Sequence, residues 1–318
     1  YWQQQVDYLI DVELDEVNHR ITGSEKITYH NNSKDTLDYL WMQLDQNLYN
    51  PKMIAAQSRT TSGISGLSFN AFEGLLQAQE FDGGYKITAV KDASGKSLKH
   101  VIVQTMMRII PPSPVKPGQK ITFSVDWNFN IVDATKMRSR MGYEYFKEDK
   151  NHLYALAQWF PRMCAYTDVN GWQNKQYLGS GEFALEFGDY LVRITAPADH
   201  IVASTGELQN PEKILTKEQR SRLAKARNSK KPVFIVNLEE AKANEKQKAK
   251  GKKTWVYKAD NVRDFAFASS RKFLWDAMGV DLNGRKIMCM SYWPKEGEPL
   301  WSRYSTHAVA HSVEVYSK

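Results

Sequence analysis

Two histidines near the end of the printed sequence have the spacing of a zinc-binding pair. His307 and His311 stand four residues apart in the stretch "YSTHAVAHSVEVYSK", and on a helix this spacing places both imidazoles on one face. It is the histidine spacing of the zinc-protease motif H-E-x-x-H, in which the glutamate acts as general base. Ala308 stands at the position of that glutamate, and its methyl group cannot accept a proton.

A catalytic zinc site also needs a third protein ligand. Glu314 lies three residues after His311, so a structural His-His-Glu cluster is conceivable. A packing role explains the pair more simply, because His311 falls on the apolar stripe of the predicted helix and His307 on its flank. We therefore expect both histidines to pack against the rest of the protein, and we expect no catalytic residue or metal ligand in this chain.

Other reactive side chains give weaker signals. Cys164 and Cys289 could form one disulfide or remain two buried thiols, and two cysteines do not define a redox compartment. The carboxylates are numerous, but paired acid–base catalysis depends on a geometry that spacing alone does not show. The aromatic residues could form a sugar-binding platform, although core packing accounts for most of them.

The charge of the chain is concentrated in one segment. The net charge is +7, and residues 212–253 hold 14 Lys and Arg against 5 Glu, a net +9 that leaves about −2 elsewhere. The segment lacks interleaved aromatic residues, so we interpret it first as a solvated insertion and only second as a polyanion-binding patch. We expect no nucleic-acid partner. No apolar run reaches the roughly 20 residues of a membrane helix, which predicts no transmembrane segment.

The elements that would position any site are mostly strands up to about residue 210. Residues 5–15 and "KITFSVDWNFNI" alternate apolar and polar side chains with period two, which is typical of half-buried antiparallel strands. Turn signals recur every 8 to 12 residues. This pattern predicts a mainly β fold, an antiparallel sandwich or saddle-like domain.

The character of the sequence changes towards its end. "TKEQRSRLAKARNSKK" favours a helix with Thr216 as N-cap, residues 271–284 look like a connection, and "RKIMCMSYWP" looks like a strand. A helix follows, with Trp301, Tyr304, Ala308, His311 and Val315 as its apolar stripe. A strand followed by a helix indicates the start of an α/β unit.

We therefore predict two parts of the chain. The first is a β domain over residues 1–270, with the basic helical insertion at about 212–253. The second is the start of a truncated catalytic domain over residues 271–318, of which the sequence would hold only the first strand and helix.

Several stretches, in this order, resemble the aminopeptidase N-like zinc metallopeptidases, the gluzincins with an N-terminal β domain. They are "YWQQQVDYLIDVELDEVNHRITGSEKITYHNNSKDTLDYLWMQL", "AQWFPRMCAYTD", "GEFALEFGDYLVRITAPADHIVASTGEL", "NVRDFAFASSRKF" and "IMCMSYWP…HAVAHSVEVYSK". The resemblance covers nearly the whole chain, and its specificity lies in the ordered set rather than in any single motif. The family's G-x-M-E-N-like strand, H-E-x-x-H motif and later glutamate ligand are absent from the sequence.

The resemblance implies a parent enzyme that hydrolyses N-terminal residues from peptides, with zinc bound in a downstream catalytic domain. This chain alone would then be inactive and bind no zinc, and its partners would be the peptide substrate and the remainder of its own catalytic domain. By segment match, the resemblance also implies that Gln158 of "LAQWF" meets the substrate's N-terminus, a role that suits a carboxamide oxygen because it accepts hydrogen bonds from an ammonium group.

One alternative belongs to a different functional class. The chain could be a non-catalytic β-sandwich module that binds a peptide or a glycan. The abrupt start at Tyr1 resembles a processed end, which favours a periplasmic or secreted location.

Overall fold

The structure is a computed structural model of the chain. It describes residues 1–53, 68–69, 80–137, 139–179, 184–246 and 248–317. Strands predominate over helices, so the predicted mainly β class is confirmed. Within the described residues, no helix is both long and apolar enough to cross a membrane.

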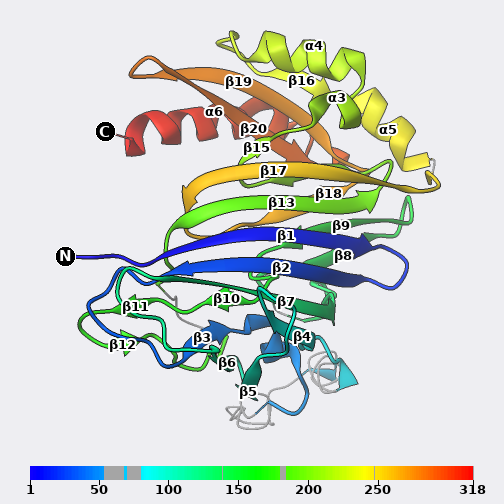
Figure 1. Cartoon of the computed structure of the whole chain (residues 1–318). Coiled ribbons are helices and arrows are strands. Elements are labelled where there is room, and N and C mark those ends of the chain that lie inside the picture. Colours follow the sequence, from blue (N-terminus) through cyan, green and yellow to red (C-terminus); the bar gives the residue numbers. More distant parts are fainter. Residues whose placement is uncertain (54–67, 70–79, 138, 180–183, 247, 318) are drawn as a thin grey trace.

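The largest sheet has seven strands and forms the long curved band in Figure 1. Its strands, in spatial order, are β15 (Glu207–Leu208), β17 (Lys252–Val262), β13 (Gly188–Pro197), β1 (Gln5–Asp15), β2 (Arg20–His30), β7 (Lys120–Asn130) and β4 (Lys86–Asp92). Neighbouring strands are antiparallel except β1 and β13, which run parallel.

Four smaller sheets complete the β structure. The first consists of β10 (Arg162–Met163), β3 (Leu40–Gln43), β6 (Met106–Ile110) and β5 (Lys99–Val103), and the second of β14 (Ile201–Ser204), β18 (Phe267–Ser270), β9 (Asn151–Leu156) and β8 (Gly142–Phe146). The third is the pair β11 (Tyr166–Thr167) and β12 (Gly171–Trp172). The fourth consists of β16 (Val233–Val236), β19 (Leu274–Leu282) and β20 (Arg285–Trp293). The helices include η1 (Asp45–Tyr49), α3 (Pro211–Ile214), α4 (Lys217–Ala226), α5 (Leu238–Lys246), η3 (Lys295–Gly297) and α6 (Leu300–Tyr316).

The period-two pattern of the first strand decides which face enters the core. Val6, Tyr8, Ile10, Val12 and Leu14 of β1 are all buried, as the sequence predicts. The same alternation holds along β7. Because side chains alternate across a strand, one residue of register shift would turn this whole apolar set towards solvent.

A glycine in β2 makes room for the largest side chain of β7. Gly23 pairs directly with Trp127, and a Cβ atom on Gly23 would lie 2.5 Å from Cζ2 of the indole. No rotamer of a larger residue would avoid this contact while the pairing is kept. The absent side chain at Gly23 therefore leaves room for the Trp127 indole.

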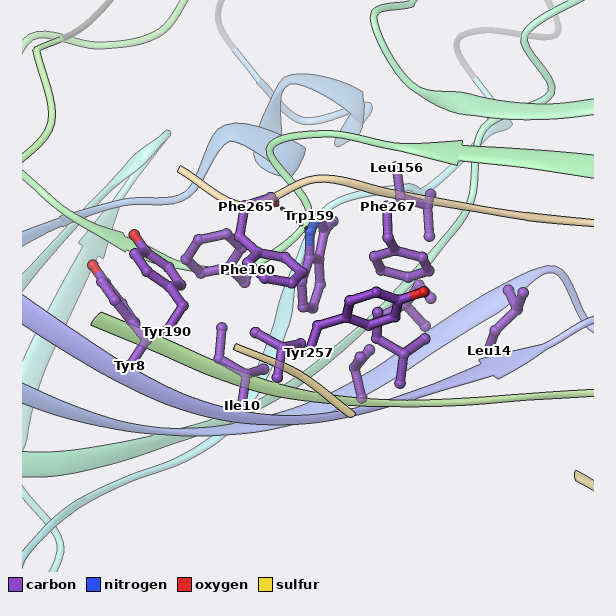
Figure 2. Packing of buried hydrophobic residues seen from close by; sticks show 14 of the residues in the cluster. Tyr8, Ile10, Leu14, Leu156, Trp159, Phe160, Tyr190, Tyr257, Phe265 and Phe267 are labelled. Carbon is purple, nitrogen blue, oxygen red and sulfur yellow. Dashed lines mark hydrogen bonds between the residues drawn. The ribbon is translucent and has the colours of Figure 1, made fainter. Parts of the chain in front are cut away.

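Aromatic rings from distant parts of the chain meet in the core. Figure 2 shows Trp159 and Phe160, which follow β9, among side chains from β1, β13, β17 and the segment before β18. The Trp159 indole makes an edge contact with Phe267 at a centroid distance of 5.1 Å. Such packing gives the loop after β9 a fixed position on the large sheet.

The basic segment is folded and belongs to one of the sheets. Thr216 caps α4 through a capping box with Gln219, which confirms the predicted N-cap. Beyond α4, β16 pairs antiparallel with β19, so the insertion shares a sheet with residues beyond 270. Figure 1 shows α3, α4 and α5 on the same side of the molecule as β16, β19 and β20. The domain boundary at residue 270 stays a prediction.

The expectation of a connection over residues 271–284 is wrong. Most of that stretch is β19, which pairs antiparallel with β20 along its full length. The first five residues of β19 are all buried, because both faces of the strand are covered. A strand buried on both faces loses the apolar–polar alternation, so the sequence pattern did not reveal it. The unit that ends in α6 therefore begins with a hairpin.

Arg271 and Lys272 join the β structure to this last unit. Arg271 is 1% exposed and donates to both carboxylate oxygens of Glu16 and to Asp199. Lys272 is 0% exposed, and its ammonium pairs with Asp149, Glu245 and Glu296. Burial alone would raise the pKa of Glu16, but the hydrogen bonds from Arg271 hold that pKa well below its ordinary value.

One buried carboxyl group is left without such a partner. Glu25 of β2 is 1% exposed, and neither carboxylate oxygen has a hydrogen-bond partner within the described part of the chain. Its neighbours across the sheet are Ile10 and Val125. Burial raises the pKa of Glu25 well above its ordinary value, because the charged form would lose its hydration.

We expect Glu25→Met to stabilise the protein at neutral and alkaline pH. The folded state keeps the proton on Glu25, whereas the unfolded chain releases it above about pH 4.3, so wild-type stability falls as pH rises through this window. The advantage of the variant should grow by up to about 1.4 kcal/mol per pH unit in urea titrations between pH 5 and pH 8. Glu144→Met, at an exposed position of β8, should show no such growth. An advantage of Glu25→Met that is equal at both pH values would contradict the buried, neutral carboxyl.

Candidate substrate-binding site

Gln158 lies in the loop between β9 and β10 and has an uncommon backbone conformation. Its φ angle is 55°, in the left-handed region that side chains other than glycine disfavour. The residue is half-buried. Its backbone conformation needs support from the surrounding structure.

Two side chains supply that support by holding the Gln158 carbonyl. Gln46 Nε2 donates to the carbonyl oxygen at 2.9 Å, and the Tyr85 hydroxyl donates to the same oxygen at 3.3 Å. Gln46 belongs to η1 and is 2% exposed. Two donors on one carbonyl fix the orientation of the peptide group, and hence the direction in which the Gln158 side chain leaves the loop.

The short helix η1 is a polar platform beneath this loop. Its first three residues, Asp45, Gln46 and Asn47, are all buried. Asn47 Oδ1 accepts from the Tyr85 backbone N–H at 2.8 Å, which places the tyrosine for its bond to Gln158. Buried polar groups of this kind are stable only when they are hydrogen-bonded, so η1 and the loop fix one another.

Asp45 ties η1 to the far end of the loop through Arg162. Arg162 Nε and Nη2 both donate to Asp45 Oδ2, at 3.2 and 2.8 Å, and Nη1 donates to Asp264 Oδ2 at 2.7 Å. Burial raises the pKa of Asp45 and the guanidinium opposes that rise. Although burial by itself would lower the pKa of Arg162, the two carboxylates raise it, so the arginine stays charged.

The indole of Trp159 anchors the middle of the loop. Its Nε1–H donates to the Phe265 carbonyl at 2.9 Å, and Figure 2 shows the indole nitrogen near Phe265. The loop is thus held by η1 on one side and by the segment between β17 and β18 on the other. The backbone at Gln158 is thus held on a rigid support, which favours a binding role for this residue.

Sequence reasoning identified Gln158 but missed the residues that position it. The signal for a buried ion pair was present, since Arg162 in "WFPRMCA" and Asp45 in "WMQLDQNLY" are each the single charged residue of an otherwise uncharged stretch. They are 117 positions apart in the chain, and nothing in the local pattern pairs them.

The predicted packing role of His307 and His311 is wrong, because both are exposed on α6. The helix contacts the sheet through Thr306 and Ala310 instead. The Thr306 hydroxyl donates to Asp276 of β19, and the small side chains allow helix and sheet to approach closely. The predicted apolar stripe therefore faces outward. Its Trp301 is 44% exposed.

The described residues hold one group of possible metal ligands, and a lysine side chain is already paired with it. In the part of the chain that the structure describes, one group of three possible ligands lies close together, namely Asp149, Glu245 and Glu296. The Lys272 ammonium already pairs with all three carboxylates, so a resident cation occupies the centre of the group. His307, His311 and Glu314 form no such group.

Both cysteines are buried free thiols, which resolves the alternative left open by the sequence. Burial raises the pKa of Cys164 above its ordinary value, so the thiolate, which is the reactive form, is disfavoured. Cys164 is therefore a packing residue.

Two open hollows lie away from the Gln158 loop. One, of about 470 Å³, is on the outer face of the large sheet and is lined by polar residues including Asp11, Ser24 and Asp126. The other, of about 510 Å³, lies between the start of α5 and the start of α6, beside Phe234 and Glu298. Neither contains Gln158.

Comparison with known proteins gives matches in structure but none in sequence. No protein-family model and no curated protein matches the chain. Among solved structures, a mutant two-domain M1 zinc metallopeptidase bound to L-tryptophan matches with a TM-score of 0.53 at 10% identity, over 100% of this chain and 54% of that one. The M1 zinc metallopeptidase of Deinococcus radiodurans matches with a TM-score of 0.51 at 11% identity, over 99% and 53%.

The fold of this chain is similar to that of M1 zinc metallopeptidase structures. The chain spans about half the length of the M1 structures that it matches. At 10 to 11% identity the likeness to the M1 structures is one of fold. The role of Gln158 stays a prediction.

The left-handed backbone at Gln158 gives a direct test of the loop geometry. We expect Gln158→Gly to be more stable than Gln158→Ala by about 1 kcal/mol, because glycine adopts a positive φ angle without a Cβ penalty. Urea denaturation of the two variants measures the difference. At Ala155, an exposed position of β9, Ala155→Gly should instead lose roughly 0.5 to 1 kcal/mol. A Gln158→Ala variant as stable as Gln158→Gly would contradict the positive φ angle.

Proposed function

We propose that this chain is the N-terminal β part of a zinc-dependent metallo-aminopeptidase of the gluzincin type, which hydrolyses N-terminal residues from peptides. The observation that supports this most is the match of the whole chain to about half of M1 zinc metallopeptidase structures. The ordered sequence segments that resemble the same family support it independently, because they include the loop that carries Gln158.

In this proposal the chain contributes substrate recognition rather than bond cleavage. The Gln158 carboxamide oxygen accepts a hydrogen bond from the free ammonium group at the substrate's N-terminus. Gln46 and Tyr85 orient the loop before substrate arrives, so little conformational entropy is lost on binding. Because the described residues offer no ligand set for zinc, we propose that the metal is bound by residues beyond this chain.

The exposed face of α6 is the proposed contact with the remainder of the enzyme. Leu300, Trp301, Tyr304 and Val315 are between 44 and 63% exposed, and large apolar side chains gathered on one helix face mark an interaction surface. The M1 structures that match this chain are about twice as long. The occupant that we propose for this face is therefore the remainder of the same polypeptide's catalytic domain.

The proposal predicts activity in a longer protein and none in this chain. Aminoacyl reporter substrates should not be hydrolysed by residues 1–318, with or without added zinc. The full protein encoded by the gene should hydrolyse them, and chelation should abolish that activity.

Hydrolysis by residues 1–318 alone would contradict the assignment of this chain to a non-catalytic part. A gene that stops at Lys318, or that continues without H-E-x-x-H and a later glutamate, would instead support the alternative of a non-catalytic binding module.

The α6 surface can be tested with a double substitution, Trp301→Gln and Tyr304→Gln. In residues 1–318 alone the unfolding free energy should change by no more than about 0.5 kcal/mol, because both side chains are exposed there. In the full protein the same change should cost roughly 2 kcal/mol or more, because it removes buried apolar area. Val169→Gln, at a position that is 83% exposed, should be neutral in both. Equal effects of the double substitution in the two proteins would refute the proposed contact.

A further inference from the structure

The basic segment, residues 212–253, carries many positive charges without a negative partner. Of its 14 Lys and Arg, three form ion pairs, namely Arg222, Lys242 and Lys252. In the described part of the chain the other 11 form none. The excess of positive charge that the sequence shows is therefore not neutralised by folding.

The glutamates of the segment are engaged elsewhere. Arg222 alone takes two of the five, because it donates to both Glu218 and Glu240. Glu245 is buried and pairs with Lys272, which lies outside the segment. These carboxylates are thus unable to neutralise the exposed lysines of the same segment.

The densest group of unpaired cations lies at the end of α4. Lys225 is in the last turn of the helix, and Arg227, Lys230 and Lys231 follow it directly. All four side chains belong to exposed residues. The carbonyl groups at the C-terminus of a helix favour nearby positive charge, so this position stabilises the group despite the repulsion between its members.

The backbone beneath this group is fixed on a sheet. The Gly279 N–H of β19 donates to the Ser229 carbonyl at 3.3 Å. A Cβ atom on Gly279 would lie 2.1 Å from the Arg227 carbonyl oxygen, so only glycine allows so close an approach. The cations therefore stand on a folded support, which holds them on one part of the surface.

The cations project outward and line no hollow described above. Figure 1 shows α3 and α4 at the outer end of the molecule, remote from β5. Neither of the two hollows has a Lys or Arg in its lining. Lysine is a flexible point charge without the fixed fork of arginine, and most of the unpaired cations are lysines. Such a surface fits an extended negative partner better than a single small anion.

We propose that the basic face, formed by the exposed Lys and Arg of residues 212–253, adsorbs to an anionic lipid bilayer. Each Lys or Arg close to such a membrane strengthens binding roughly fivefold, and the attraction extends over about 10 Å at 0.1 M salt. Leu223, the one large apolar residue of α4, packs on the core. The attachment is therefore electrostatic, without insertion of the helix.

The distribution of charge favours a bilayer over a nucleic acid. The segment has a net charge of +9 and the rest of the chain about −2, so one face is attracted and the others are not. A planar partner meets only that face. Single-stranded nucleic acids stack on exposed aromatic rings, and Phe234 is the one aromatic residue of the segment.

Cosedimentation with lipid vesicles tests the inference. The chain is mixed with vesicles of phosphatidylcholine and phosphatidylglycerol, and vesicles of phosphatidylcholine alone are the uncharged comparison. We expect binding to the anionic vesicles at low salt and its loss at about 1 M salt, where screening acts within about 3 Å. Neutralising the group at the end of α4, by Lys225→Gln, Arg227→Gln, Lys230→Gln and Lys231→Gln together, should weaken binding roughly tenfold or more.

A matched control removes the same charge from the other end of the molecule. Lys34→Gln, Lys96→Gln, Lys116→Gln and Lys120→Gln together change exposed lysines between β2 and the start of β7. Affinity should stay within about twofold of the wild type, because charges beyond a Debye length are screened.

A second variant keeps the test decisive if the first one fails to fold in urea titrations. Lys246→Gln, Lys248→Gln, Lys250→Gln and Lys253→Gln together neutralise exposed lysines at the other end of the segment and should also weaken binding. No binding of the wild type to anionic vesicles, equal binding to neutral ones, or an equal loss in the control variant overturns the inference. Gel-shift binding of duplex DNA without vesicle binding overturns it in favour of a nucleic acid. None of these outcomes bears on the peptidase proposal, which rests on other residues.

Discussion

Two consecutive buried cations, Arg271 and Lys272, determine how the parts of this molecule are joined. Both residues lie in the turn between β18 and β19, and the two charges reach different groups of carboxylates. Their carboxylate partners are Glu16 and Asp199 for Arg271, and Asp149, Glu245 and Glu296 for Lys272. A buried charge costs several kcal/mol unless it is paired. Every segment that supplies a partner is therefore fixed relative to this point, including the turn after β1, the end of α5 and η3 before α6.

The need to pair a buried charge also applies at Arg162, where it fixes the path of a single loop. Hydrophobic packing of Trp159 and Phe160 draws the loop into the core, but apolar contact is non-directional and would tolerate several backbone paths. Directional hydrogen bonds from Arg162 to Asp45 and Asp264, together with the donors on the Gln158 carbonyl, select one path. The loop therefore combines burial for stability with polar anchors for orientation, and this combination gives its exposed groups a defined direction.

In the helix α6, unlike in that loop, the large apolar side chains are exposed. It places Thr306 and Ala310 against the sheet and leaves its large apolar residues outside. Polar groups of the sheet explain this choice, since Asp276 and Ser291 are buried beneath the helix and each is hydrogen-bonded to the Thr306 hydroxyl. An apolar side chain in that place would leave the Asp276 carboxylate without a donor. The contact with the sheet is thus decided by hydrogen bonding, and the apolar face remains for a further layer of structure.

The sequence alone determined the local features of this protein. Period-two alternation identified β1 and β7, Thr216 marked the start of α4, and ordered motifs indicated the fold and the loop of Gln158. Only the tertiary structure decided which face of α6 is buried, that residues 274–282 form a strand, and that Gln158 is held in a left-handed conformation. The reason is physical. Periodicity and capping depend on residues within a few positions of one another, whereas a buried ion pair joins residues more than 100 positions apart, and only the folded chain brings them into contact.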